Sequence, residues 1–189
     1  MGRAAETPAL IAKYSAADPQ GFELQRSEFR TSILGAESAV AVNDRGVGLM
    51  RQGKFAEAEA LYRHALELDP SSHLAMTNMG IVRGAQSDAA GESQWHDKAV
   101  QTGGDDASPW YWRARSLAAH RQLERAVGDL QVSLTKRNAG MSNAAALAAV
   151  LLAQGRASEA EAVISKWRPA EPAAFDAAVA EVRGLIPPK

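Results

Sequence analysis

The feature that most constrains the fold of this chain is an amphipathic segment, residues 55–70, which recurs in weaker form further along the sequence. Gly53 precedes it and Asp69-Pro70 ends it, because glycine accepts a positive φ angle and proline disfavours helix in the preceding residue. The segment therefore predicts a helix that must bury one face. The apolar or small residues of that face recur at helical spacing: Phe55, Ala58, Leu61, Tyr62, Ala65 and Leu66.

The residues before this helix predict a second one. In residues 39–52, Val42, Gly46, Leu49 and Met50 follow helical spacing, with glycines where a close neighbour needs room. Two helices joined by a short turn form a helical hairpin. Such a hairpin buries its apolar faces only against other elements, so we expect further hairpins to pack on it.

This hairpin resembles the tetratricopeptide repeat, a helix-turn-helix unit that recurs at a fixed period along the chain. Counted from Ala39, the positions at which that repeat has small residues or a proline hold Gly46, Ala58, Ala65 and Pro70. The resemblance implies an all-α fold, namely an α-solenoid of about four helix-turn-helix repeats in a right-handed superhelix.

The small residue at the eighth position of the repeat recurs at the period of the family, as Gly46, Gly80, Ala114 and Ala148. The register therefore predicts a repeat domain over residues 39–170, with repeats at 39–72, 73–106, 107–140 and 141–170. Trp167 stands where the fourth repeat should have a small residue, so we expect no ordinary fifth repeat to follow.

The repeat at 73–106 departs furthest from the pattern. Glu92 replaces the usual alanine, and Ser87, Asp88 and Gly91 weaken the turn and the start of its second helix. We expect this repeat to be the least regular, with a displaced helix.

The two ends of the chain do not fit the repeat. Residues 1–38 predict a helical extension, for which two roles stay open: it covers the start of the array, or it is an arm that binds a neighbouring subunit or the chain's own groove. Residues 171–189 predict a capping helix and tail. The inner side of that helix is expected to consist of Phe175, Val179, Val182 and Ile186.

Charge and composition argue against several classes of partner. The formal net charge is −1, with no basic stripe of the kind that nucleic-acid binding requires. No apolar run is long enough to cross a bilayer or to form a signal peptide, so no membrane insertion is expected. The absence of cysteine fits cytosol and periplasm alike. We expect a cytoplasmic protein, or a periplasmic one if a leader is missing from this sequence.

No pattern in the sequence indicates catalysis, a metal or a cofactor. The histidines His64, His73, His96 and His120 are scattered, without the spacing of a metal site. Gly46-Val-Gly48 lacks the Lys-Ser/Thr end of a phosphate-binding loop, and no nucleophile motif occurs. The prediction is a protein without enzymatic activity, cofactor or metal.

The resemblance further implies that the first helix of each hairpin lines a concave groove that binds a peptide or helix of another protein. The part of this groove formed by the first repeats is polar. Its back, the part formed by the fourth repeat with Ala145, Ala149 and Leu152, is apolar. The cations of the carboxylate clamp that chaperone-binding members use are missing here. The predicted partner-binding residues are Asn43, Asp44, Val47, Arg51, Thr77, Asn78, Ile81, Tyr111, Trp112 and Arg115, with Leu74 beside them.

Among these residues, Tyr111, Trp112 and Arg115 are the best candidates for a contact patch, because aromatic rings and arginine dominate binding energy where they occur. Trp110, their neighbour, is expected in the core. The predicted function is that of a protein–protein interaction scaffold. The alternative is a self-associating subunit of a larger assembly, a homo-oligomer.

Overall fold

The computed structural model describes residues 38–188, and this range contains nine α-helices and no strand. The predicted all-α fold is therefore confirmed for the described residues, whereas the extension predicted over residues 1–38 lies outside them except for its last residue. The helices are α3 (Ala39–Arg51), α4 (Phe55–Leu68), α5 (His73–Ala85), α6 (Ala89–Thr102), α7 (Ser108–Ala119), α8 (Leu123–Ser133), α9 (Met141–Ala153), α10 (Ala157–Trp167) and α11 (Pro172–Leu185).

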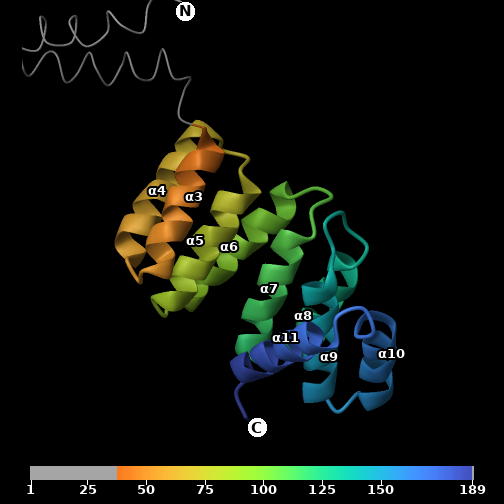
Figure 1. Cartoon of the computed structure of the whole chain (residues 1–189). Coiled ribbons are helices and arrows are strands. Elements are labelled where there is room, and N and C mark those ends of the chain that lie inside the picture. Colours follow the sequence, from red (N-terminus) through yellow and green to blue (C-terminus); the bar gives the residue numbers. More distant parts are fainter. Residues whose placement is uncertain (1–37, 189) are drawn as a thin grey trace, which may run out of the picture.

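Helices α3 to α10 form four antiparallel hairpins that follow one another through the molecule (Figure 1). The helices of each hairpin pack together, and the second helix of one hairpin packs on the first helix of the next: α4 on α5, α6 on α7 and α8 on α9. Each hairpin thus buries its faces between its neighbours, as in other helical solenoids.

The turns inside the four hairpins share one backbone conformation at one repeat position. Gly53, Ser87, Arg121 and Gly155 all have positive φ angles, between 57° and 78°, and each occupies the same place in its own repeat. The left-handed conformation ends the first helix and reverses the chain. Only Gly53 and Gly155 adopt it without a steric cost, because a Cβ atom disfavours it.

Small residues at the eighth repeat position let the two helices of a hairpin approach closely. A Cβ atom on Gly46 would lie 2.5 Å from the Tyr62 ring, and one on Gly80 would lie 2.7 Å from the His96 ring. The next two hairpins have Ala114 and Ala148 at this position, both fully buried. The flat rings in the first two hairpins therefore require glycine.

The prediction that the repeat at 73–106 is the least regular was wrong. Its second helix, α6, is continuous over 14 residues. Asp88 is its N-cap residue and accepts a hydrogen bond from the Gly91 amide at 2.9 Å, which stabilises the helix start. Glu92, which replaces the usual alanine, pairs with His120 of the next hairpin. The residues that weaken the pattern thus form the cap and a contact between repeats.

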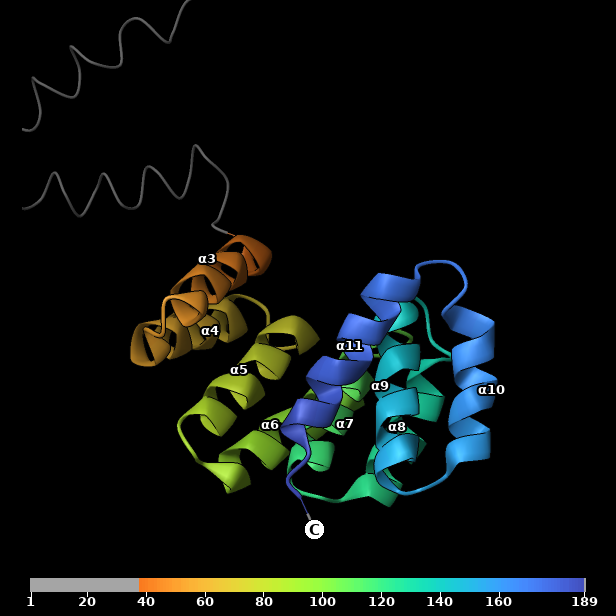
Figure 2. The same cartoon turned by 60° about the horizontal axis from the view of Figure 1, so that its bottom comes forward.

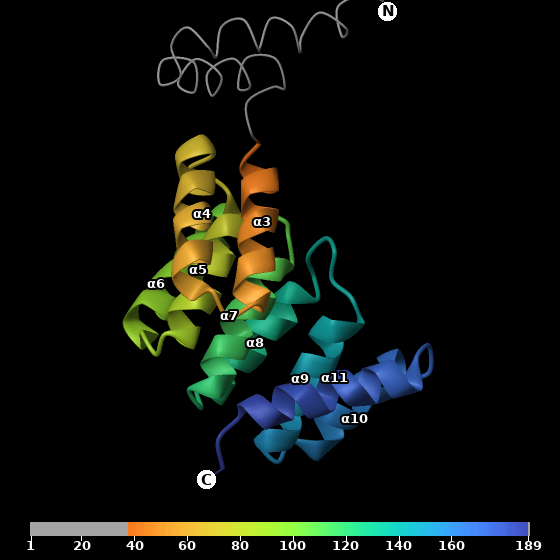
Figure 3. The same cartoon turned by 60° about the vertical axis from the view of Figure 1, so that its left-hand side comes forward.

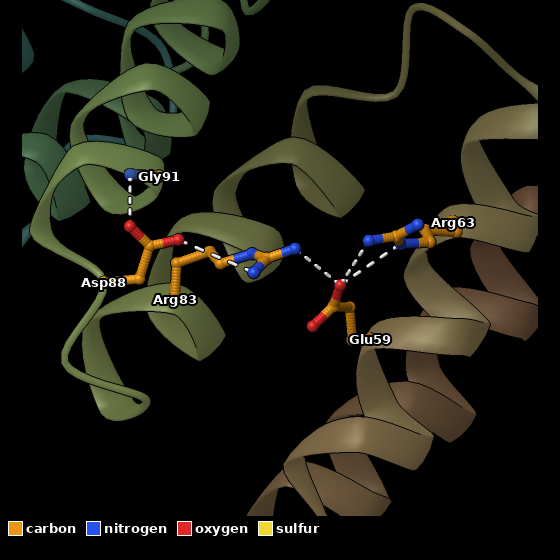
Figure 4. A network of polar contacts seen from close by, with 5 residues as sticks. All are labelled: Glu59, Arg63, Arg83, Asp88 and Gly91. Atoms are coloured by element: carbon orange, nitrogen blue, oxygen red, sulfur yellow. Dashed lines mark hydrogen bonds and ion pairs between the residues drawn. The ribbon is translucent and has the colours of Figure 1, made fainter.

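Ion pairs join the first two hairpins on the side of α4 (Figure 4). Glu59 of α4 accepts hydrogen bonds from Arg63 at 2.6 Å and from Arg83 of α5 at 2.7 Å. Arg83 also lies 3.5 Å from Asp88, which caps α6. The network therefore connects two successive repeats and reaches the start of α6, the second helix of the second repeat.

Among residues 38–188, the largest buried cluster lies in the second half of the array and includes residues of α11. At its centre, α9 has nine consecutive buried residues, 143–151. A helix that is buried all round must have neighbours on every side. The side of α9 that the hairpins leave open is covered by α11, which folds back over the hairpins instead of extending them (Figures 2 and 3).

Candidate functional site: the first-helix face

The first helices of the four hairpins, α3, α5, α7 and α9, form one surface of the array, which we call the first-helix face. All of the predicted partner-binding residues lie on the first three of these helices. Helix α11 lies on α9 and reaches α7, so it covers the C-terminal half of the face and leaves α3 and α5 open.

The polar residues predicted on α3 and α5 divide into buried and exposed ones. Asn43 and Thr77 are buried, with 4% and 3% of their surface exposed, so neither presents a side chain to a partner. Asn43 instead accepts a hydrogen bond from the side chain of Asn78 at 2.8 Å and so ties α3 to α5. Asp44 and Arg51 are exposed, and Asn78 is half-buried.

Apolar side chains on the same two helices complete the open half of the face. Val47 and Ile81 occupy the ninth repeat position and are half-buried. At the second position, Val40 and Leu74 are 55% and 40% exposed, which is unusual for large apolar residues in the described part of the chain. Sequence reasoning missed Val40, although it occupies in the first repeat the position that Leu74 occupies in the second.

The side chains of Tyr111, Trp112 and Arg115 form one cluster on α7. The two rings meet edge to face with their centroids 5.3 Å apart. The guanidinium of Arg115 lies 5.0 Å from the Trp112 ring and donates a hydrogen bond to the Tyr111 hydroxyl at 2.8 Å. Cation–π and hydrogen-bond contacts of this kind hold the three side chains in fixed relative positions.

Helix α11 contributes a carboxylate to this cluster. Glu181 accepts a hydrogen bond from Arg115 at 2.7 Å. Burial lowers the pKa of Arg115, but its hydrogen bonds to Glu181 and Tyr111 outweigh that effect and raise the pKa above its ordinary value. The cation is therefore already paired within the chain. All three residues of the cluster are half-buried.

The back of the predicted groove is closed. Ala145 and Ala149 of α9 are fully buried, and Leu152 is half-buried. Ala145 packs in one cluster with Phe175, and Ala149 packs in another with Val182. The apolar character of these positions is thus explained by α11, a contact that the sequence analysis did not foresee.

Trp110 was expected in the core but is only half-buried. Arg113 stacks over its ring with 5.1 Å between the guanidinium carbon and the ring centroid. Arg113 also makes two hydrogen bonds of 2.7 Å to Asp129 and one of 3.0 Å to Asp97. Trp110 therefore shields a polar link between α6, α7 and α8 rather than filling an apolar site.

Outside the first-helix face, a small cavity of about 160 Å³ lies between α6, α7 and α8. Its polar lining includes Asp97, Arg113 and His120. Each of these groups already pairs within the chain, Arg113 with both aspartates and His120 with Glu92. Within residues 38–188, no three metal-ligating side chains come together, and no helix is long and apolar enough to cross a membrane.

The hairpins and their stacking define the class of the protein: an α-helical repeat solenoid whose first helices form a common face. Comparison with known families makes this specific, since residues 39–72 match the tetratricopeptide repeat. That segment is the first hairpin, in the register predicted from Ala39. Residues 39–72 are thus a tetratricopeptide repeat, and the described chain has the fold of tetratricopeptide-repeat proteins.

Solved structures with this fold match over most of the chain. The pilF protein of Pseudomonas aeruginosa has a TM-score of 0.67 and 20% identity, covering 77% of this chain and 68% of its own. YrrB, a tetratricopeptide protein with an unusual peptide-binding site, has a TM-score of 0.57 and 18% identity, covering 86% and 75%.

A third similar structure is the first tetratricopeptide domain of Spaghetti (RPAP3) bound to the HSP90 peptide SRMEEVD. It has a TM-score of 0.57 and 20% identity, covering 63% of this chain and 97% of its own. No curated protein matches the chain in sequence. At these identities the structural likeness establishes the fold.

Proposed function

We propose that this protein is a non-catalytic interaction scaffold that binds a peptide or helix of another protein on the open half of its first-helix face. The observation that carries the proposal is the exposure of Val40 and Leu74 at one repeat position on adjacent first helices. Exposed apolar side chains that recur at the repeat spacing form a regular surface, and such surfaces typically mark interaction sites.

The contact surface that we propose runs from α3 across α5 to the edge of α7. Asp44, Arg51 and Asn78 supply polar groups, and Trp112 supplies an aromatic edge at the boundary with α11. Rigid aromatic side chains contribute strongly to protein recognition. RPAP3 and YrrB, which share the fold, both have peptide-binding sites, and this supports a peptide-like partner here.

The charges of this surface favour a partner that is not strongly acidic. Arg51 is an exposed cation on α3, and Asp44 on the same helix offsets it. Arg115 already pairs with Glu181 at 2.7 Å. A peptide as acidic as the one bound to RPAP3 needs several unpaired cations for charge-assisted hydrogen bonds. We therefore propose an uncharged, largely apolar segment as the ligand.

Site-specific photo-crosslinking in the source cells tests this proposal. A benzoylphenylalanine placed at Leu74, on the first-helix face, is expected to capture a partner protein. The same group at the exposed Glu67 of α4, on the second helices, is the matched control and is expected to capture none. Equal capture at both positions, or no capture at Leu74, would refute the proposed face.

A third variant tests the aromatic edge. Trp112→Ala in the Leu74-labelled chain is expected to reduce the captured partner at least fivefold while the helix content stays the same. Unchanged capture would remove Trp112 from the contact surface. Crosslinks between two copies of this chain would favour the alternative function, a self-associating subunit.

A further inference from the structure

Helix α11 does not continue the array. Along the chain, each first helix packs on the second helix of the preceding hairpin, as α5 packs on α4, α7 on α6 and α9 on α8. A fifth first helix would accordingly lie along α10. Instead, α11 lies along α9 and reaches α7, so its main neighbours are two first helices. It occupies the first-helix face itself (Figure 2).

An apolar side of α11 holds it on this face. Phe175 and Val182 are buried, with 0% and 2% of their surface exposed, and Val179 between them is half-buried. Their spacing of four and three residues places them on one side of the helix. Phe175 packs with Ala144, Ala145 and Ala148, and Val182 lies in the cluster with Ala149.

Alanine on α9 creates the site for this helix. Small side chains allow a second helix backbone to approach closely. The open half of the face differs, because α3 and α5 carry exposed polar residues such as Asp44 and Arg51. A surface of closely spaced buried alanines is therefore found on the C-terminal half of the face, on α9, and not on α3 and α5. The fully buried alanines of α9 are Ala144, Ala145, Ala146, Ala148 and Ala149.

Polar contacts fix the position of α11 along the face. Glu181 pairs with Arg115 of α7 at 2.7 Å, and the side chain of Arg115 is only 13% exposed. Beyond the helix, Arg121 donates a hydrogen bond to the backbone carbonyl of Pro187. The face therefore presents a partly buried cation to a carboxylate that lies six residues after the first apolar anchor, Phe175.

We propose that this half of the first-helix face is a receptor for an amphipathic helix and that α11 is its built-in occupant. The partner that fits is a helix of another protein with the α11 pattern: an aromatic anchor, aliphatic residues four and seven positions later, and a carboxylate six positions later. This proposal goes beyond the proposed function, because it assigns a partner helix to the half of the face that α11 covers.

The covalent link gives α11 an advantage over any partner helix. A tethered segment binds at an effective concentration in the millimolar range, so an untethered helix must compete against it. Helix α11 is the last helix of the described chain, and only residues 168–171 connect it to α10. Helices α3 to α10 also contact one another directly, so we expect the four hairpins to stay packed when α11 is released.

Fluorescence anisotropy with the full chain tests this competition. The probe is a labelled synthetic peptide of residues 170–188, which supplies α11 as a separate molecule. We expect the parent chain to bind it weakly, because the receptor is occupied. Val182→Asp places a charge in the apolar contact and releases the tethered helix, so this variant should bind the peptide at least tenfold more tightly. Ala180→Asp, at an exposed position of α11, is the matched control and should behave as the parent.

A charge exchange tests the register. In the Val182→Asp chain, Arg115→Glu should weaken binding of the parent peptide at least fivefold, and a peptide carrying Glu181→Arg should recover the affinity. A purely structural effect of Arg115 would not be rescued in this way. Full-chain Glu181→Arg, whose exposed side chain leaves the core intact, is a second way to weaken α11 and should also increase peptide binding.

Two results would overturn the proposal: no peptide binding by either weakened chain, or equal binding by parent and Val182→Asp chains. Neither result touches the crosslinking at Leu74, which tests the open half of the face. Conversely, loss of the Leu74 crosslink with intact peptide competition would refute the proposed function and leave the receptor for α11 in place.

Discussion

His96 gives a quantitative link between the packing of this fold and its pH dependence. Its ring is 1% exposed and lies against Gly80, where a Cβ atom would come within 2.7 Å. Burial lowers the pKa of His96 from 6.5 to about 4, opposed by Glu92 and Asp97 and assisted by Arg113. The folded state therefore holds a neutral imidazole over a pH range in which the unfolded chain is protonated.

The sign and size of the effect follow from proton linkage. Below pH 6.5 the imidazole of His96 binds a proton in the unfolded chain but not in the folded chain. The free energy of unfolding is therefore highest above that pH and falls as the pH approaches 4. At about pH 4.5 the two pKa values correspond to a loss of roughly 2.5 kcal/mol relative to neutral pH. That is a large part of the stability of a small domain.

His96→Phe isolates this contribution. A flat six-membered ring already lies against glycine in the first hairpin, where Tyr62 packs on Gly46, so phenylalanine fits the same geometry. The variant also removes a buried imidazole nitrogen, Nδ1, that has no hydrogen-bond partner. We expect similar stabilities at neutral pH and a variant that is more stable by roughly 2.5 kcal/mol at about pH 4.5.

Urea unfolding followed by far-ultraviolet circular dichroism, at several pH values between about 7 and 4.5, measures the difference. Gln94→Ala, which changes an exposed, uncharged residue of the same helix, is the control and should leave the pH dependence as in the parent. If the free energies of unfolding of the parent and of His96→Phe change in parallel with pH over this range, burial of His96 does not control the acid sensitivity, and the reasoning fails.

Three further predictions concern stability and can be measured by the same unfolding assay. Gly80→Ala should lower the free energy of unfolding by about 1–2 kcal/mol, because its Cβ would overlap the His96 ring. Gly128→Ala, with open space around it, should stabilise α8 by about 0.5–1 kcal/mol. Equal effects of the two variants would contradict the close contact between Gly80 and His96. Ser87→Gly should stabilise by about 0.5 kcal/mol, because glycine adopts the φ of 62° without strain, and a loss of stability would argue against that strain. Arg113→Met should cost about 2–3 kcal/mol, since it leaves the buried carboxylate of Asp129 without its two hydrogen bonds, and a neutral result would show that the pair adds nothing.

The repeat fold could be predicted because its determinants are local and periodic. Small residues at 46, 80, 114 and 148 keep their spacing, and each lies where two helices of a hairpin meet. The second hairpin was misjudged for a related reason. Asp88 and Glu92 depart from the consensus, but their side chains act as an N-cap and as an inter-repeat contact, which a consensus pattern does not represent.

The position of α11 could not be predicted in the same way. The apolar residues from Phe175 to Val182 indicate that one side of this helix is buried. The same pattern is compatible with a helix that stacks on α10 and continues the array. The informative signal lay in α9, whose alanines continue around the helix onto the side that repeat positions alone would leave in solvent. Likewise, repeat position alone could not show that Asn43 and Thr77 are buried, since that depends on how closely α3 and α5 approach.

Because α11 folds back onto α9 and α7, the number of hairpins ahead of α7 can change without changing how the last two first helices are covered. The main contacts of α11 are with the last two first helices and with the turn at Arg121. An additional hairpin inserted upstream of α7 would lengthen the exposed surface and leave the terminal closure unchanged. An insertion after α10 would separate α11 from α7 and α9, so only hairpins added ahead of α7 leave these contacts of α11 unchanged.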